Sequence, residues 1–277
     1  MAIKQEFDLV IEASRSNKNY WSDLWKYREL FFFLAWRDIL VRYKQTVIGL
    51  AWSLIRPFLT MIIFTIIFGR LANLPSGGMP YAIMVYAGML PWQFFSTSFN
   101  DSSNSLITNS NMLTKIYFPR MIVPASTVIV NFIDFLISFV LFIALMLWYH
   151  YVPSWTILTL PVFFVWVVLI SMGTGFYVAA VNVKYRDFKY IVPFVVQFGL
   201  YISPVGFSSN VIPDKWRLLY SANPIASVID GFRWAITGDT HYIYLPGLFL
   251  SMVITLLFLL FGTLYFRRME RVFADLV

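Results

Sequence analysis

The chain has 277 residues, of which 59% are hydrophobic, 19% aromatic and only 13% charged, and its formal net charge is +7. Soluble domains carry about a quarter charged residues. This composition, with a mean hydropathy of +0.70, therefore excludes a soluble enzyme or a disordered tail and indicates a membrane protein. The sequence contains no cysteine, which excludes disulfides, thiolate metal sites and a cysteine nucleophile.

The first 47 residues form a segment of mixed charge without the basic start, apolar run and cleavage site of a signal peptide. Within it, Trp25–Lys44 combines aromatic and charged residues, which predicts an amphipathic helix lying in the membrane interface. Arg37, Arg42 and Lys44 are then expected to attract anionic lipid headgroups. The alternative, a helix covering a soluble domain, is disfavoured because the sequence contains no such domain.

Residues 48–277 read as one all-α membrane domain, because a helix needs about 20 apolar residues to cross the bilayer. The fifth apolar stretch is short and ends at Ser203-Pro204, and the residues from there to Thr240 are too polar to span. We expect a broken or re-entrant element there, buried in protein or facing water. The six predicted spans are Ile48–Gly69, Tyr81–Ser105, Met121–Tyr149, Ile157–Val181, Tyr190–Phe207 and Leu245–Phe266.

The positions of the basic residues predict the orientation of the chain. Most of the 21 Lys and Arg residues fall in the N-terminal segment, in the connections after the second and fourth spans, and after the sixth span. Short cytoplasmic connections are enriched in Lys and Arg, so both termini are expected to be cytoplasmic.

Several ordered motifs carry a family resemblance. The run Arg37–Trp52, then Pro57, then Leu90-Pro91-Trp92 with Phe95, resembles the membrane subunit of bacterial polysaccharide exporters of the ABC-2 class. The resemblance continues in the same order through Lys115–Arg120, Pro124, Tyr185-Arg186-Asp187, Gln197, Ser203-Pro204-Val205, Asn223-Pro224 and Arg233.

This resemblance implies six transmembrane helices, an N-terminal amphipathic helix, a cytoplasmic coupling helix between spans two and three, and external gate helices before span six. It also implies a homodimer of permease copies in the bacterial cytoplasmic membrane, working with two ABC ATPase subunits. The expected substrate is a lipid-linked polysaccharide such as O-antigen, capsule or teichoic acid, with polyprenyl pyrophosphate as the expected carrier.

The source of energy must lie in another chain. No glycine in the sequence is followed by lysine, so the phosphate-binding motif G-x-x-x-x-G-K-[ST] is absent. ATP and Mg²⁺ are expected on the partner ATPase, with no cofactor in this chain. The predicted docking surface includes five apolar residues of the loop after span two, although they can alternatively dip into the inner leaflet: Met112, Leu113, Ile116, Tyr117 and Phe118.

Ionisable residues at membrane depth are candidates for function. Arg56 lies eight residues into the first span, where it either faces a water-filled cavity and binds phosphate or snorkels to the surface as a structural residue. Asp134, one turn after Asn131 in the third span, is expected to make a structural polar contact at the dimer interface or in the bundle interior.

Aromatic residues form two ladders at helical spacing, which suits stacking on the CH faces of sugars. Aromatic rings on membrane helices also commonly face lipid, so both interpretations stay open for each ladder. The span-five ladder has Tyr190, Phe194, Phe198 and Tyr201 with Gln197 beside them, and the span-two ladder has Trp92, Phe95 and Phe99.

Motifs of catalysis are missing from the sequence. His150 and His241 are isolated, and neither a paired-carboxylate motif nor H-E-x-x-H occurs. The sequence therefore predicts a transport subunit without a metal site, the channel-forming permease of an ATP-driven polysaccharide exporter. The alternatives are an exporter of a small drug or lipid on the same fold, and an integral-membrane enzyme acting on polyprenyl lipids.

Overall fold

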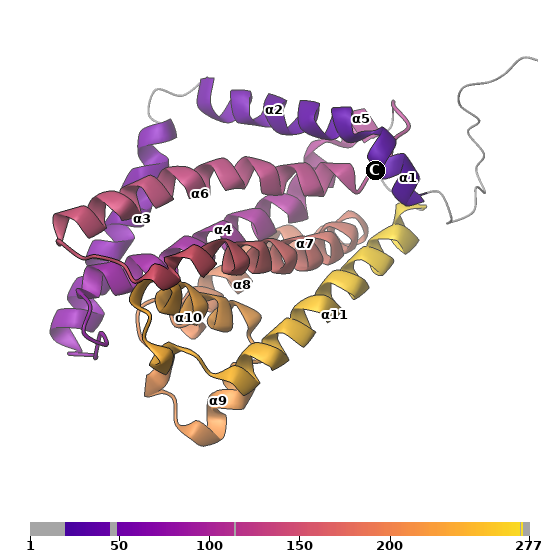
Figure 1. The fold of residues 1–277 in the computed structure, drawn as a ribbon. Coiled ribbons are helices and arrows are strands. Elements are labelled where there is room, and N and C mark those ends of the chain that lie inside the picture. Colours follow the sequence, from indigo (N-terminus) through magenta and orange to yellow (C-terminus); the bar gives the residue numbers. More distant parts are fainter. Residues whose placement is uncertain (1–19, 45–48, 114, 272, 274–277) are drawn as a thin grey trace, which may run out of the picture.

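The computed structural model describes residues 20–44, 49–113, 115–271 and 273, and every regular element within them is helical (Figure 1). Residues 1–19 of the predicted N-terminal segment, residues 45–48 and Thr114 lie outside this description. The longer helices are α2 Arg28–Lys44, α3 Gly49–Phe64, α4 Tyr81–Thr108, α6 Ile122–Trp148, α7 Leu160–Lys184, α8 Phe188–Ile202, α10 Pro224–Thr237 and α11 Leu245–Glu270. The shorter elements are α1 Tyr20–Lys26, η2 Thr65–Leu71, α5 Ser110–Leu113, η3 Trp155–Thr159, η4 Ser209–Val211, α9 Asp214–Tyr220 and η5 Thr240–Tyr242.

Each predicted span corresponds to a helix in the structure. Within the described residues, four helical segments are both long and apolar enough to cross a membrane: Leu54–Leu71, Ile122–Trp148, Trp155–Lys184 and Leu245–Glu270. The chain is therefore a multi-pass membrane protein. The other two predicted spans are also helical. Helix α4 differs from these four in its more polar composition, and α8 differs in its shorter length.

The low hydropathy of α4 follows from its position. This helix packs against α6 on one side and α7 on the other, and it also contacts α3, α8 and α10. Most of its residues are buried, including the polar Ser98, Ser102, Ser103 and Ser105. A helix enclosed by other helices needs no lipid-facing surface, so hydroxyl groups replace apolar side chains in its C-terminal half.

Helix α8 is shorter than the predicted fifth span, which extended to Phe207. It ends at Ile202, and Ser203 takes an extended conformation with φ −78° and ψ 149°. Pro204 explains this end, because the residue before a proline is disfavoured in the helical region. At about 1.5 Å per residue, the 15 residues of α8 extend roughly 22 Å, less than the bilayer core of about 30 Å.

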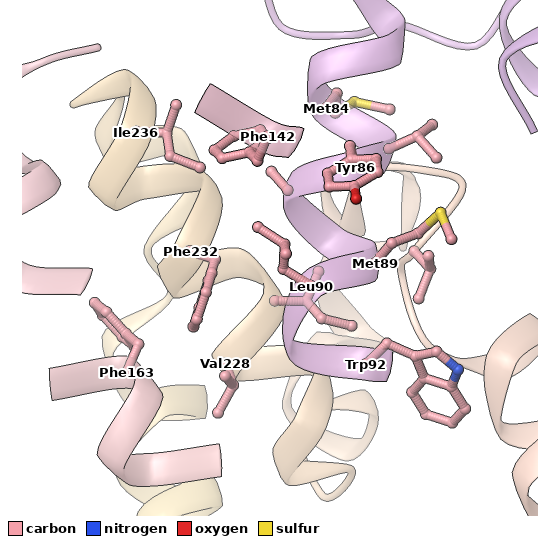
Figure 2. Packing of buried hydrophobic residues seen from close by; sticks show 14 of the residues in the cluster. Met84, Tyr86, Met89, Leu90, Trp92, Phe142, Phe163, Val228, Phe232 and Ile236 are labelled. Carbon is pink, nitrogen blue, oxygen red and sulfur yellow. The ribbon is translucent and has the colours of Figure 1, made fainter. Parts of the chain in front are cut away.

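The segment between α8 and α11 folds back into the bundle. Pro224 begins α10 at a position where its missing N–H costs nothing, and Gly238 ends the helix with φ 72°. Helix α10 packs against α4 and α7 and is buried over most of its length. Figure 2 shows Val228, Phe232 and Ile236 of α10 within the same apolar cluster as α4.

Two glycines allow α7 and α11 to pack with their backbones in contact. A Cβ placed on Gly262 would lie 2.1 Å from the carbonyl oxygen of Gly173, and one on Gly173 would lie 2.6 Å from the backbone nitrogen of Leu259. Such distances exclude any side chain at either position. Close approach through small residues is a common way for membrane helices to associate.

The segment Trp25–Lys44, predicted as an amphipathic helix, is helical as the end of α1 and as α2, with a break at Tyr27. Helix α2 lies alongside α6 (Figure 1) and buries Leu34 and Ala35 against the bundle. Phe32 and Trp36 on its outer face are 64% and 61% exposed. An exposed aromatic face marks a surface that contacts lipid or another protein, and the contact of α2 with lipid stays a prediction.

Candidate functional site

A partly open cavity of about 870 Å³ lies between α3, α4, α6 and α8, and the C-terminal end of α2 contributes to its wall. These helices include four of the six predicted spans. The lining is mixed, with cations, carboxylates, amides and hydroxyls beside apolar and aromatic side chains. The charged, amide and hydroxyl residues are Arg42, Tyr43, Arg56, Thr60, Gln93, Ser96, Thr97, Asn100, Asp101, Asn131, Asp134, Ser138, Gln197 and Tyr201.

Arg56 lies on the wall of this cavity, on α3 just before the buried Pro57. Gln197 and Tyr201 reach the same cavity from α8. Among the described residues, the guanidinium of Arg56 makes no hydrogen bond or ion pair, and its side chain is exposed. The structure thus places the cation Arg56 on the wall of a polar cavity.

Arg42 is not directed toward lipid headgroups, and its prediction is corrected on this point. The Nη1 atom of Arg42 donates to Asp134 at 2.5 Å and to the Asn131 side-chain oxygen at 2.8 Å. Its Nη2 atom donates to Asp101 at 2.8 Å. The Tyr43 hydroxyl donates a further hydrogen bond to Asp134. The expected structural contact of Asp134 and Asn131 is therefore present, and its partner is the end of α2.

The environment of this cluster keeps its groups in definite protonation states. Burial acts to lower the pKa of Arg42, but the carboxylates of Asp101 and Asp134 outweigh it and the net shift is upward. Burial raises the pKa of the Tyr43 hydroxyl, and the hydrogen bond to Asp134 raises it further. Arg42 is therefore charged and Tyr43 is a neutral donor at any physiological pH.

The hydroxyl groups of α4 at the cavity face are oriented by their own helix. Ser96 donates to the carbonyl oxygen of Gln93 at 3.0 Å, and Thr97 donates to the same oxygen at 2.8 Å. A hydroxyl that donates to a preceding carbonyl keeps its lone pairs available. This wall therefore offers acceptors from hydroxyls and both donors and acceptors from amides, a surface suited to a solute rich in hydroxyl groups.

Within one copy, the structure does not bring the two aromatic ladders together. Trp92 is only 5% exposed and packs under Gly199 of α8, where an added Cβ would lie 2.6 Å from the indole ring. Phe95 and Phe99 stack with their ring centroids 5.6 Å apart and pack against Val192 of α8. Of the span-two ladder, only Trp92 lines the cavity.

The span-five ladder lies mostly outside the cavity. Tyr190, Phe194, Phe198 and Tyr201 are between 53% and 70% exposed, and their spacing in α8 puts them on one side of the helix. The rings of Phe194 and Phe198 lie 4.4 Å apart between centroids. Tyr201 and the neighbouring Gln197 line the cavity, whereas the other three rings do not.

The predicted coupling surface divides into two groups. Leu113 and Phe118 are 5% and 3% exposed, in an apolar cluster with Leu34 of α2, so they are not available to a partner. Met112 packs partly against the same cluster. Ile116 and Tyr117, at 58% and 66% exposure, form the outward part of the segment. The composition of this irregular segment could not predict which of its side chains are buried and which are exposed.

The remaining predicted headgroup residues lie at the surface or near it. Arg37 pairs with Asp38 at 2.7 Å and donates to the Asn109 side-chain oxygen at 2.9 Å. Lys44 is exposed at the end of α2. These two residues are placed where attraction of an anionic surface is possible, although Arg37 already has a carboxylate partner.

Two polar features were missed at the sequence level. Asp101 was not singled out, although a carboxylate in a predicted span is a signal for a functional or paired group. Arg233 was named in the sequence only as part of the family resemblance. In the structure it is fully buried and donates to the carbonyl oxygens of Val205 at 3.0 Å and Phe207 at 2.8 Å. Its role depends on the fold of distant segments.

Comparison with known proteins identifies the family. Residues 29–237 match the family described as ABC-2 type transporter. The chain is 27% identical to an O-antigen export system permease protein RfbA of Klebsiella pneumoniae over 252 residues, which cover 90% of this chain and 95% of the relative. It is also 27% identical to a Myxococcus xanthus protein of the same name over 215 residues, covering 76% of this chain and 81% of the relative. Because the family match includes every residue of the cavity, the chain belongs to the ABC-2 type transporter family and is a membrane transport subunit.

Proposed function

We propose that this chain is the channel-forming permease of an ATP-driven exporter that moves a lipid-linked polysaccharide across the bacterial cytoplasmic membrane. The carrier lipid is a polyprenyl pyrophosphate, and its headgroup enters the cavity that contains Arg56. ATP and Mg²⁺ are bound by a separate ATPase, since the sequence carries no phosphate-binding loop of the G-x-x-x-x-G-K-[ST] type.

The names of the relatives support a glycan as the substrate class. Both are named as permease proteins of O-antigen export systems, and one of them is covered over 95% of its length. The polar wall of the cavity supports the same class, because amides and hydroxyls match the hydroxyl groups of sugars. A small apolar drug or lipid would bind better in an apolar pocket. The alternative function, export of a small drug or lipid, is therefore disfavoured.

The observation that carries the proposal is the position of Arg56. A guanidinium with no carboxylate partner among the described residues lies on a cavity formed by four predicted spans. Moving a pyrophosphate from the leaflet surface to this depth costs free energy unless a cation neutralises it. Arginine is suited to this task because its planar fork binds phosphate oxygens in pairs.

The full assembly in this proposal has six spans per copy, with α4 and α8 added to the four long apolar helices. Both termini are cytoplasmic, and α9 and α10 form the gate helices on the external side. Two copies face each other above two ATPase subunits. The exposed aromatic face of α8 supports this arrangement, because a second copy and the glycan between the copies would cover it.

Export by variants of Arg56 tests the function. At equal protein levels, we expect surface glycan to decrease in the order wild type, Arg56→Lys, then Arg56→Gln or Arg56→Ala, with Arg56→Glu essentially inactive. Lysine keeps the charge without the fork, and glutamine keeps only a polar side chain. Surface glycan is measured by antibody or lectin labelling of intact cells.

A matched control is Arg70→Glu, which makes the same change of charge directly after the same predicted span, in η2. Arg70 is exposed and does not line the cavity, so this variant should export normally. Normal surface glycan in Arg56→Glu would contradict the proposal and leave Arg56 as a snorkelled or structural residue.

A further inference from the structure

The end of α2 is fastened to the cavity wall mainly by charge. The first half of the helix is held by the apolar side chains Leu34 and Ala35, which are 2% and 3% exposed. Its last turns reach the bundle through Arg42 and Tyr43, while Val41 is 55% exposed. An apolar anchor at one end and a polar anchor at the other allow the polar end to detach without unfolding the helix.

The polar anchor joins three helices at one point of the cavity. Arg42 of α2 bridges Asp101 of α4 and Asp134 of α6, at 2.8 and 2.5 Å. The side chains of these three residues remain 37%, 30% and 23% exposed, so solvent in the cavity reaches them. The bridge is therefore accessible to a competing anion.

The two carboxylates present oxygens to Arg42 in the way that phosphate groups would. The carboxylate is planar and the phosphate is tetrahedral, but the oxygens of each accept charge-assisted hydrogen bonds from a guanidinium. The strengths of the arginine–carboxylate and arginine–phosphate pairings are similar. An exchange between them is close to balanced, and such an exchange can be driven by a substrate. Arg56 lies on the same cavity and supplies a second cation for the incoming anion.

We propose that Asp101 and Asp134 hold Arg42 in place of the phosphate groups of the substrate, and that a prenyl pyrophosphate displaces them and releases the end of α2 from the cavity wall. Arg42 is then a second phosphate-binding residue beside Arg56, and α2 is a strap that opens when the headgroup arrives. This inference rests on the function proposed above, because it requires a pyrophosphate in the cavity.

Charge makes the release directional. Among the described residues that line the cavity, the charged ones are the cations Arg42 and Arg56 and the anions Asp101 and Asp134, so their formal charges balance. An incoming pyrophosphate repels the two carboxylates and attracts both guanidinium groups. Arg42 is therefore drawn from its carboxylate partners toward the phosphate.

The test measures the distance between α2 and α6 in the complete complex with its ATPase, in lipid nanodiscs. The absence of native cysteine permits spin labels at Val41→Cys and Val140→Cys, both of which replace exposed residues. We expect one short distance without ligand and a longer one with geranylgeranyl pyrophosphate. The alcohol geranylgeraniol, which lacks phosphates, should leave the distance short, and inorganic pyrophosphate shows whether the anion alone suffices.

Removal of the carboxylates should open the strap without any ligand. In Asp101→Asn with Asp134→Asn, we expect the long-distance population to rise about tenfold, which corresponds to the loss of one or two charge-assisted hydrogen bonds. Asp101→Glu keeps a carboxylate and should remain closed. Asp38→Asn is the matched control, because it removes a carboxylate paired with an arginine of the same helix away from the cavity.

The inference is overturned if the double asparagine variant shows the wild-type distance without ligand, or if geranylgeranyl pyrophosphate leaves the wild-type distance unchanged. Either result combined with loss of export in Arg56→Glu removes the strap and leaves the proposed function in place. Normal export in Arg56→Glu overturns the proposed function whatever the distances are.

Discussion

Arg233 shows how one buried cation organises the segment before the last span. Its guanidinium is fully buried and bonds to carbonyl oxygens of α4 and of the turn after α8, with Asp230 at 3.9 Å on its own helix. The carbonyls of Val205 and Phe207 belong to the irregular turn after α8, and non-helical backbone is tolerated at membrane depth only when protein satisfies its polar groups. Arg233 therefore fixes α10 to the bundle.

Replacing Arg233 with Gln should destabilise the protein by about 3 to 5 kcal/mol, because Asp230 is left as an unpaired buried charge. The expected result is a lower apparent melting temperature and a lower yield of monodisperse protein in detergent. Lys215→Gln, at an exposed position of α9, should change neither. Equal melting temperatures for the two variants would refute the role assigned to Arg233.

At the residue scale, the sequence identified candidate positions but not their partners. Arg56 could be singled out because an arginine within an apolar run is a candidate for function. Arg42 could not be placed correctly, since its partners Asp101 and Asp134 are 59 and 92 positions away in sequence. Such pairings depend on how helices pack, and no local pattern encodes them.

At the scale of elements, the long spans were predictable and the irregular ones were less so. Apolar runs set the extent of α6, α7 and α11, and Pro204 marks where α8 ends. The burial of α10 was not readable in detail, because its apolar face is completed by neighbours such as α4 and α7. The same limitation applies to the loop after α4, where inward and outward residues alternate without a helical period.

The loop after α4 yields a prediction that separates docking from folding. Ile116→Ala with Tyr117→Ala should lower export and glycan-stimulated ATP hydrolysis while the protein level stays normal, because these exposed side chains are available to the ATPase. Phe118→Ala should instead lower stability, by roughly 3 to 5 kcal/mol for a buried phenylalanine. The measurements are ATP turnover of the purified complex and its melting temperature.

The docking interpretation fails if the Ile116 and Tyr117 double variant hydrolyses ATP and exports glycan at wild-type rates. In that case the two side chains contact the inner leaflet, which is the alternative that the sequence left open. Loss of protein in this variant would contradict the assignment of these residues to the surface.

At the scale of the whole molecule, one copy leaves an unpartnered aromatic face on α8. Tyr190, Phe194 and Phe198 are exposed and stand outside the cavity of their own chain. Under the proposed function, two copies enclose the route of the glycan. Native mass spectrometry of the complex should therefore give two permease and two ATPase subunits, and one permease per pair of ATPases would exclude this assembly.

The central claim is that this permease moves a lipid-linked glycan with energy from a separate ATPase, and that Arg56 neutralises the headgroup on the way. The most direct measurement uses the purified complex in proteoliposomes loaded with lipid-linked glycan, with translocated glycan detected by an externally added glycosidase. We predict ATP-dependent translocation by the wild-type complex and none by Arg56→Glu, although both complexes assemble. Equal translocation by the two complexes would contradict the role of Arg56, and ATP hydrolysis without any translocation by the wild type would contradict the assigned substrate.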